Sequence, residues 1–232
     1  MTKPLRTRTK TSENYYINHK QTLLRDFDKT SQKFGRKALD LHFDADSTEK
    51  IIRESREEFE VLIPKLPYVG GKKSIWTTDL VRSAWALALY RTVKAQGKTA
   101  EDTGEILTKI VEMQLYSYPR FIRYLVGRWS FNRFSLRKMK KQASESQKRL
   151  FLENWIWNYI SGDGKEFDFG YDITDCGLCK FFHNEGADEL VPYLCATEFL
   201  KSTALGIRLV RKTTLAESHD KCNFRYKKGR VK

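Results

Sequence analysis

The spacing of apolar residues predicts helices for the first two-thirds of the chain. Apolar side chains recur there every three or four positions, which is typical of a helix with one buried face. Thr99 and Asp102 have the spacing of a capping box at the start of one such helix. Pro64 and Pro119 mark helix ends. We expect helices over residues 23–34, 47–63, 79–96, 99–118 and 120–160, the last with a break near 144–146.

The period of the pattern changes after residues 162–164. Apolar side chains then alternate with polar ones, which predicts a strand with one buried face over residues 167–173. Two helices follow, over 175–185 and 188–204, and then two strands, over 206–216 and 220–227, joined closely enough to form a hairpin. This order predicts an α+β fold, in which an N-terminal α-helical layer packs on a small C-terminal antiparallel sheet with two helices.

The length and composition of the chain are those of a folded protein. Its 232 residues are 40% hydrophobic and 13% aromatic, which excludes global disorder. We expect residues 1–18 to form a basic flexible tail and residues 19–232 a single α+β domain, with a helical part over 19–160 and the site within 161–227.

The hydropathy of the chain favours a cytoplasmic protein without a membrane partner. No stretch reaches the roughly 20 apolar residues of a spanning helix. The basic start, Met1 to Lys10, is not followed by the apolar segment of a secretory signal.

Positive charge is the strongest bias in the composition. The chain has 43 Lys and Arg against 29 Asp and Glu, a net charge of +14, and residues 120–149 contain ten basic residues and one acid among aromatic side chains. This pattern suits nucleic acid or another anionic surface. A packed helix pair with a buried aromatic stripe and solvated charges has the same pattern. We favour the helix pair, and expect nucleic-acid binding to be weak and salt-sensitive. The sequence does not indicate an oligomeric state.

All four cysteines lie in the last quarter of the chain. A disulfide scaffold normally spreads its bridges along a short secreted chain, so this grouping favours free thiols. Cys176, Cys179 and Cys195, with Glu198, have a spacing seen in zinc sites. They fall within predicted helices, however, and not in the turns of a zinc knuckle. We therefore expect no metal and no other cofactor.

Cys195 and Glu198 form the first candidate pair for chemistry. A spacing of three on a helix places the thiol and the carboxylate on one face, about 5–6 Å apart at Cβ. A thiolate can attack an electrophilic carbon while a carboxylate moves protons. The carboxylate alone raises the thiol pKa, so activation also requires positive charge nearby. The alternative is a buried small thiol beside a surface glutamate.

Arg211 is the second candidate. Alternation along the predicted strand 206–216 places it on an otherwise largely apolar face, pointing toward the core or a cleft. An unpaired buried guanidinium is costly, so it requires a partner. A structural carboxylate and a bound anionic ligand both satisfy this requirement.

Several motifs of the chain resemble the L-2-amino-thiazoline-4-carboxylic acid hydrolase family. Similar segments occur in the helical part at residues 63–64, 70–71 and 84–90, and in the C-terminal part at 167–176, 192–198, 211–216 and 222–225. The resemblance covers most of residues 35–226. The activity that names this family opens the ring of 2-amino-thiazoline-4-carboxylate with water and gives a carbamoyl-cysteine.

The resemblance implies a hydrolase of a C–N bond in a small cyclic amidine-like carboxylate. This chemistry requires a nucleophile or activated water at the ring carbon, a proton for the departing nitrogen and a cation for the carboxylate. We expect the catalytic residues to be Cys195, Glu198 and Cys222. The residues that we expect to contact the substrate are Arg211, Thr214, Asn223, Arg225 and Cys176. The alternative is a non-catalytic anion- or nucleic-acid-binding protein that keeps the family fold.

Overall fold

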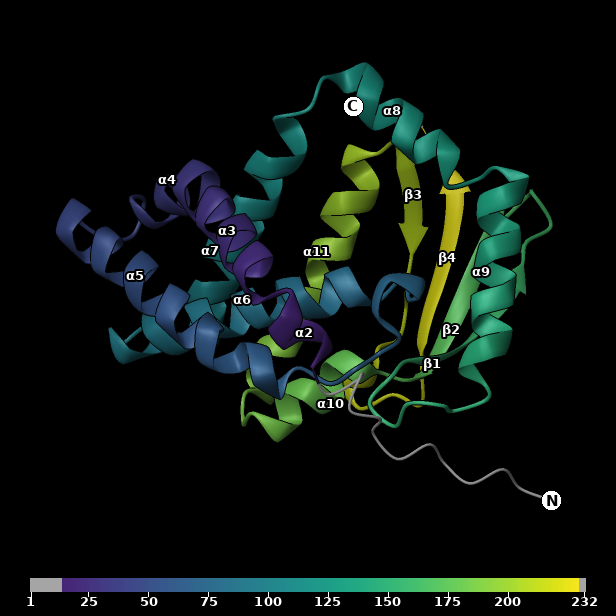
Figure 1. Ribbon diagram of the computed structural model, residues 1–232. Helices are drawn as coiled ribbons and strands as arrows, with labels where there is room; N and C mark the ends of the chain where they lie inside the picture. The colour runs from purple at the N-terminus through teal and green to yellow at the C-terminus, as the bar shows by residue number, and fades with distance from the viewer. Residues whose placement is uncertain (1–13, 230–232) are drawn as a thin grey trace.

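The computed structural model describes residues 14–229, which form a helical half and a sheet half (Figure 1). Helices α3 to α7 lie on one side, and a four-stranded sheet with α8 and α9 lies on the other. Helix α11 runs between the two halves in Figure 1. The predicted α+β class is confirmed.

The helical half contains the elements that periodicity predicts. Asp44 caps α5 by accepting a hydrogen bond from the Ser47 backbone N–H at 2.9 Å, so this helix begins before Ser47. Thr99 and Asp102 form the predicted capping box. The helices are α2 (Tyr15–Asn18), α3 (Lys20–Thr30), a π-helical turn (Ser31–Gly35), α4 (Arg36–Leu39), α5 (Ala45–Leu62), α6 (Thr77–Ala95) and α7 (Ala100–Tyr116).

The sheet is antiparallel, with the strand order β1-β2-β4-β3. Tyr171 lies opposite Phe224 and Ile173 opposite Cys222, so these side chains share one face of the sheet. This inner face is the buried one and packs against the helices. The strands are β1 (Ile156–Ser161), β2 (Phe169–Asp175), β3 (Ile207–Val210) and β4 (Cys222–Lys228).

Four further helices connect the sheet to the helical half. The Ser146 hydroxyl bonds to both the backbone N–H and C=O of Trp157, at 3.2 Å each, which fixes α9 on β1. A Cβ on Gly104 would lie 2.6 Å from the Tyr193 ring, so this glycine allows α7 and α11 to pack closely. These helices are α8 (Arg120–Trp129), α9 (Arg133–Ser146), α10 (Gly177–Asn184) and α11 (Val191–Ala204).

Three expectations from the sequence differ from the structure. Residues 156–160, expected to be helical, lie in β1, because their aromatic and β-branched side chains pair with β2 and cover the core. The last two strands are not a tight hairpin: β3 ends at Val210, and residues 211–221 separate it from β4. Residues 15–18, expected to lie in the tail, form the helix α2 with a buried Tyr16, and residues 1–13 of the expected tail lie outside the described part.

The helix pair expected over residues 120–149 is also wrong in one respect. α9 packs on β1, but the aromatic side chains of α8 are not buried: Phe121 and Trp129 are 63% and 67% exposed. The side of α8 that faces the protein contains Arg123 and Gly127.

We predict that Gly127→Ala destabilises the protein by about 1–3 kcal/mol, because a Cβ there would lie only 2.0 Å from the Leu205 carbonyl oxygen. Gly35→Ala is the matched control. Its Cβ would meet no atom closer than 3.6 Å, so the free energy of unfolding should change by less than about 1 kcal/mol. Denaturant titrations of both variants measure the difference. Equal stabilities would contradict the close packing of α8 on the end of α11.

Candidate active site

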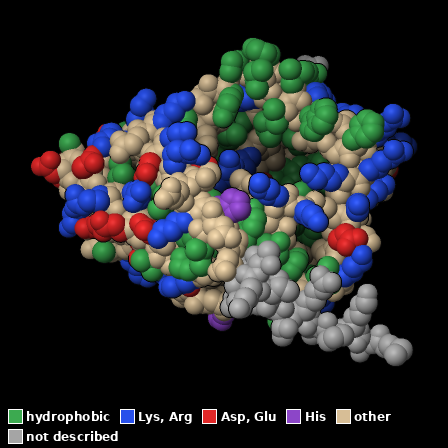
Figure 2. Space-filling model, in the orientation of Figure 1, with side chains coloured by type: hydrophobic (Ala, Val, Ile, Leu, Met, Phe, Trp, Pro, Cys, Tyr) green, Lys and Arg blue, Asp and Glu red, His purple; other side chains and the backbone are tan. Residues whose placement is uncertain are grey.

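Polar and charged side chains gather where α6, α11 and the inner face of the sheet meet. Figure 2 shows a hollow at this place, over α11 and β3, with Lys and Arg side chains inside it and hydrophobic side chains along its rim. Cys195 lies within electrostatic range of Cys176, Glu198, Arg211 and Cys222. The structure therefore brings together five of the residues that the sequence indicates.

Glu198 is part of a carboxylate–lysine–carboxylate group. Its Oε1 accepts a hydrogen bond from Lys201 Nζ at 2.6 Å, and Lys201 also interacts with Asp79 near the start of α6. Burial opposes the charge of Lys201, but the two carboxylates outweigh it and raise the lysine pKa. The ammonium group is thus held charged between two acids.

Asp79 differs from Glu198 in its surroundings. Burial raises the pKa of Asp79, and the charge of Lys201 opposes this effect while that of Glu198 adds to it. Two neighbouring carboxyl groups in different environments are a common basis for acid–base chemistry. Sequence reasoning placed Asp79 only at a helix start. It missed Lys201 as well, although its spacing of three from Glu198 was a usable signal.

Two tyrosines of the sheet border this group, the buried Tyr226 and the half-buried Tyr171. The hydroxyl oxygens of Tyr171 on β2 and Tyr226 on β4 lie 2.7 Å apart. Burial raises the pKa of both, so both hydroxyls are neutral and can donate and accept hydrogen bonds. The sequence pattern shows them only as core aromatics of two strands. Trp76 lies edge-on to Tyr171, with ring centroids 6.3 Å apart.

Arg211 lies just beyond the end of β3 and turns toward α11. Its Nη1 donates a hydrogen bond to the Cys195 carbonyl oxygen at 3.0 Å. The guanidinium carbon lies 4.9 Å from the ring centroid of Phe199 and 5.2 Å from that of Phe224. No carboxylate of residues 14–229 forms an ion pair with it. Of the two partners left open by the sequence, the structural carboxylate is therefore not found in this part of the chain.

Cys222 is buried and Cys195 is half-buried, and both thiols are protonated. Burial raises the pKa of Cys195 to about 12, although the nearby Arg211 charge opposes the effect. Burial also raises the pKa of Cys222, whose sulfur accepts a hydrogen bond from the Leu215 backbone N–H at 3.2 Å. Cys176 is buried and interacts with Cys179. All four cysteines are free, and within residues 14–229 no group of His, Cys, Asp and Glu side chains is arranged to hold a metal ion.

Three of the expected substrate contacts have structural partners elsewhere. Arg225 lies on the outer face of the sheet, where its Nη1 is 2.7 Å from Asp172 Oδ1. Asn223 Oδ1 accepts hydrogen bonds from the backbone N–H groups of Lys212 and Thr213. The Thr214 hydroxyl donates to Glu217 and caps the short 3₁₀ turn Leu215–Glu217.

Thr213, two residues after Arg211, has a hydroxyl that is free to form a hydrogen bond. The Thr213 hydroxyl is buried and has no hydrogen-bond partner among the described residues. Thr213 shares the alternating pattern of Arg211, which was the signal in the sequence.

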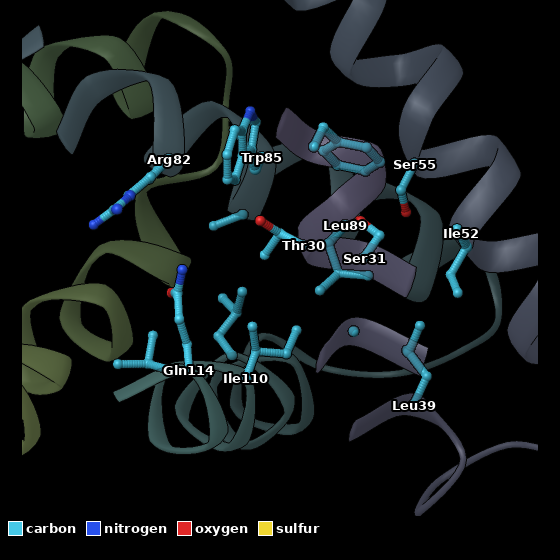
Figure 3. A pocket seen from close by; sticks show the side chains of 15 residues that line it. Thr30, Ser31, Leu39, Ile52, Ser55, Arg82, Trp85, Leu89, Ile110 and Gln114 are labelled. Atoms are coloured by element: carbon cyan, nitrogen blue, oxygen red, sulfur yellow. The ribbon is translucent and has the colours of Figure 1, made fainter. Parts of the chain in front are cut away.

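A second cavity lies in the helical half, between α3, α5, α6 and α7 (Figure 3). It has a volume of about 110 Å³ and a mostly apolar lining that includes Trp85, Leu89 and Ile110. Figure 3 shows Arg82 and Gln114 at one side of it. None of the cysteines or expected site residues lines this cavity, so the candidate active site is the polar group around α11.

We predict that Cys195 reacts slowly with iodoacetamide near neutral pH. Because its pKa is about 12, its alkylation rate should rise about tenfold per pH unit up to about pH 10, without a plateau. Free cysteine, which levels off near its ordinary pKa, and the unfolded protein are the controls. Peptide-resolved mass spectrometry measures the rate. A plateau near neutral pH would show that the thiol is activated and would contradict this description.

Comparison with known proteins gives one match. A profile of the family described as L-2-amino-thiazoline-4-carboxylic acid hydrolase matches residues 80–226, from the first turn of α6 to β4. Searches among curated proteins and among solved structures found no match. The matched region is more than half of the chain and contains the expected site residues on α11 and the sheet. The chain belongs to the L-2-amino-thiazoline-4-carboxylic acid hydrolase family.

Proposed function

We propose that the protein hydrolyses a C–N bond of a small cyclic amidine-like carboxylate, such as 2-amino-thiazoline-4-carboxylate, and forms a carbamoyl-cysteine. The family supplies the reaction class. The observation that carries the proposal is Arg211, a cation with no acidic partner among residues 14–229, next to the acid–base group of Asp79, Lys201 and Glu198.

Arg211 is suited to bind the carboxylate of such a substrate. The rings of Phe199 and Phe224 lie near its guanidinium, and the Cys195 carbonyl uses one of its donors. An arginine has five N–H donors, so a further pair remains for a carboxylate. The planar fork fits two carboxylate oxygens better than a lysine does. Asn223 positions Arg211 indirectly, through the backbone of residues 212–213.

Glu198 is the proposed proton carrier. Water adds its oxygen to the ring carbon that bears the exocyclic amine, and Glu198 accepts a proton from this water and passes it to the ring nitrogen. As the carbon–nitrogen bond breaks, the hydroxyl of the adduct becomes a carbonyl and its proton also goes to that nitrogen. Both water protons thus end on the new amine. Lys201 holds the Glu198 carboxylate in place, and Asp79 supports the charge of Lys201.

Water is the nucleophile that these surroundings favour. Direct attack by Cys195 would require a thiolate, and burial holds the pKa of this thiol at about 12. The roles of Cys195 and Cys222 in this proposal are to shape the wall of the site. A Cys195→Ser protein with normal turnover would agree with attack by water, and loss of turnover with an intact fold would favour a covalent intermediate.

We predict that the purified protein adds one water to 2-amino-thiazoline-4-carboxylate and that Glu198→Gln lowers the rate about 10²–10⁴-fold. The control Glu112→Gln changes a surface carboxylate paired with Lys109 and should leave the rate unchanged. Mass spectrometry detects the product. Opening of the C–N bond frees an amine and leaves no thiol, whereas release of a thiol would show that the C–S bond breaks instead.

We predict that Arg211→Lys weakens substrate binding by about 1.5–3 kcal/mol, because the charge stays but the fork is lost. The melting temperature should change little. Arg225→Lys is the matched control, since Arg225 pairs with Asp172 on the outer face of the sheet and should not affect affinity. Ligand titration and thermal unfolding separate the two effects. A destabilised Arg211→Lys protein with unchanged affinity would contradict the assignment.

The alternative function is binding of an anion without catalysis. An arginine without an acidic partner could serve either a carboxylate substrate or a bound anion. Ligand titration and mass spectrometry distinguish the two functions. If the carboxylate binds with an affinity that depends on Arg211 and is recovered with unchanged mass, the protein binds the anion and does not hydrolyse it.

A further inference from the structure

Helix α8 is turned so that its apolar side faces away from the protein. Helices of a folded protein normally bury their apolar face and expose their polar one. In α8 the buried residues are Arg123 and Gly127. Phe121, Leu125 and Trp129, which lie on the opposite side, are 63%, 58% and 67% exposed.

Specific contacts hold α8 in this orientation. Arg123 donates a hydrogen bond from Nη1 to the Ala204 carbonyl oxygen at 2.9 Å, and its guanidinium lies 4.4 Å from the ring centroid of Tyr116. Gly127 lies so close to the Leu205 carbonyl that any larger residue would clash. Rotation of the helix about its axis would break all of these contacts. The packing of α8 therefore fixes its apolar face in the outward orientation.

This surface is large. Figure 2 shows its side chains gathered at the top of the view, over α8. Since each aromatic residue offers about 150–250 Å² and roughly half of that is exposed here, the area is roughly 500 Å² or more. Patches of this size on a monomer usually mark an interaction site. We define the aromatic patch as Tyr118, Phe121, Leu125, Val126, Trp129 and Phe134, which are 49–67% exposed.

The charge around the aromatic patch indicates a negative partner. No acidic residue occurs between Glu112 and Glu145, and this stretch contains eight Lys and Arg residues, of which only Arg123 is buried. The chain as a whole has a net charge of +14. A second copy placed on the patch would bring two positive surfaces together, which is unfavourable. Aromatic side chains flanked by Lys and Arg suit the interface of an anionic lipid bilayer.

We propose that the aromatic patch docks the protein on anionic lipid membranes, with α8 lying along the surface. No helix within residues 14–229 is long and apolar enough to cross a membrane, and surface docking requires none. The sequence predicts no membrane partner, because it lacks a spanning segment. That prediction concerns helices that cross the membrane, whereas α8 would lie along its surface. This inference does not depend on the proposed reaction.

The test is cosedimentation of the full chain with vesicles of phosphatidylcholine alone or mixed with phosphatidylglycerol. We expect binding to the mixed vesicles only, with an affinity that falls as salt is added. The double variant L125S/W129S should lower this affinity at least about tenfold. Leu41→Ser, which changes a leucine 65% exposed in the helical half, is the control and should bind like the unchanged protein. The three substituted residues, Leu41, Leu125 and Trp129, all lie on the surface, and thermal unfolding tests whether the variants fold.

Three results would overturn the proposal: no binding to either vesicle, binding to the mixed vesicles that L125S/W129S does not reduce, or equal binding to neutral vesicles. Sedimentation velocity gives a further check. A dimer that L125S/W129S converts to monomer would identify a second copy as the occupant of the patch instead of lipid.

Discussion

Half-buried charged side chains between the helical half and the sheet half constrain this structure most. Taking a charge even partly out of water is destabilising without compensation, so each of these groups depends on its neighbours. Lys201 is balanced by Glu198 and Asp79, and Arg211 is held in place by a backbone carbonyl and two aromatic rings. Because these partners come from α6, α11 and the segment after β3, the three elements must keep their relative positions.

The outer face of the sheet supports the inner one. Asp172 bonds to Arg225 and Lys221, and Asn223 beside it holds the backbone of Lys212 and Thr213. The contacts of Asn223 set where the chain leaves β3 and therefore where the guanidinium that follows is directed. Residues that do not enter the hollow thus determine the geometry within it.

Features that depend on local spacing could be predicted from the sequence. The capping box at Thr99 and the shared face of Cys195 and Glu198 follow from positions three residues apart, and the family resemblance rests on short motifs. Tyr171 and Tyr226 could not be paired in advance, because their meeting depends on β2 and β4 being neighbours although 55 residues apart.

The orientation of α8 could not be predicted for a related reason. Periodicity shows that a helix has two different faces, and the usual assumption is that the apolar one is buried. Here the close approach of Gly127 to Leu205 decides which face is inward, and that contact joins residues far apart in the sequence. The strand β1 was missed because its run of aromatic residues continues a helical stretch without a break in composition.

The tyrosine pair gives the candidate site a further property. Either oxygen of the Tyr171–Tyr226 hydrogen bond can be the donor, so the pair has two arrangements of hydrogen atoms with the same positions of the heavier atoms. In one arrangement the Tyr171 hydroxyl has a hydrogen to offer elsewhere, and in the other the Tyr226 hydroxyl has it. Switching between them requires only rotation of two O–H bonds. The tyrosine pair can therefore offer a hydrogen-bond donor at either of two points without movement of the heavier atoms.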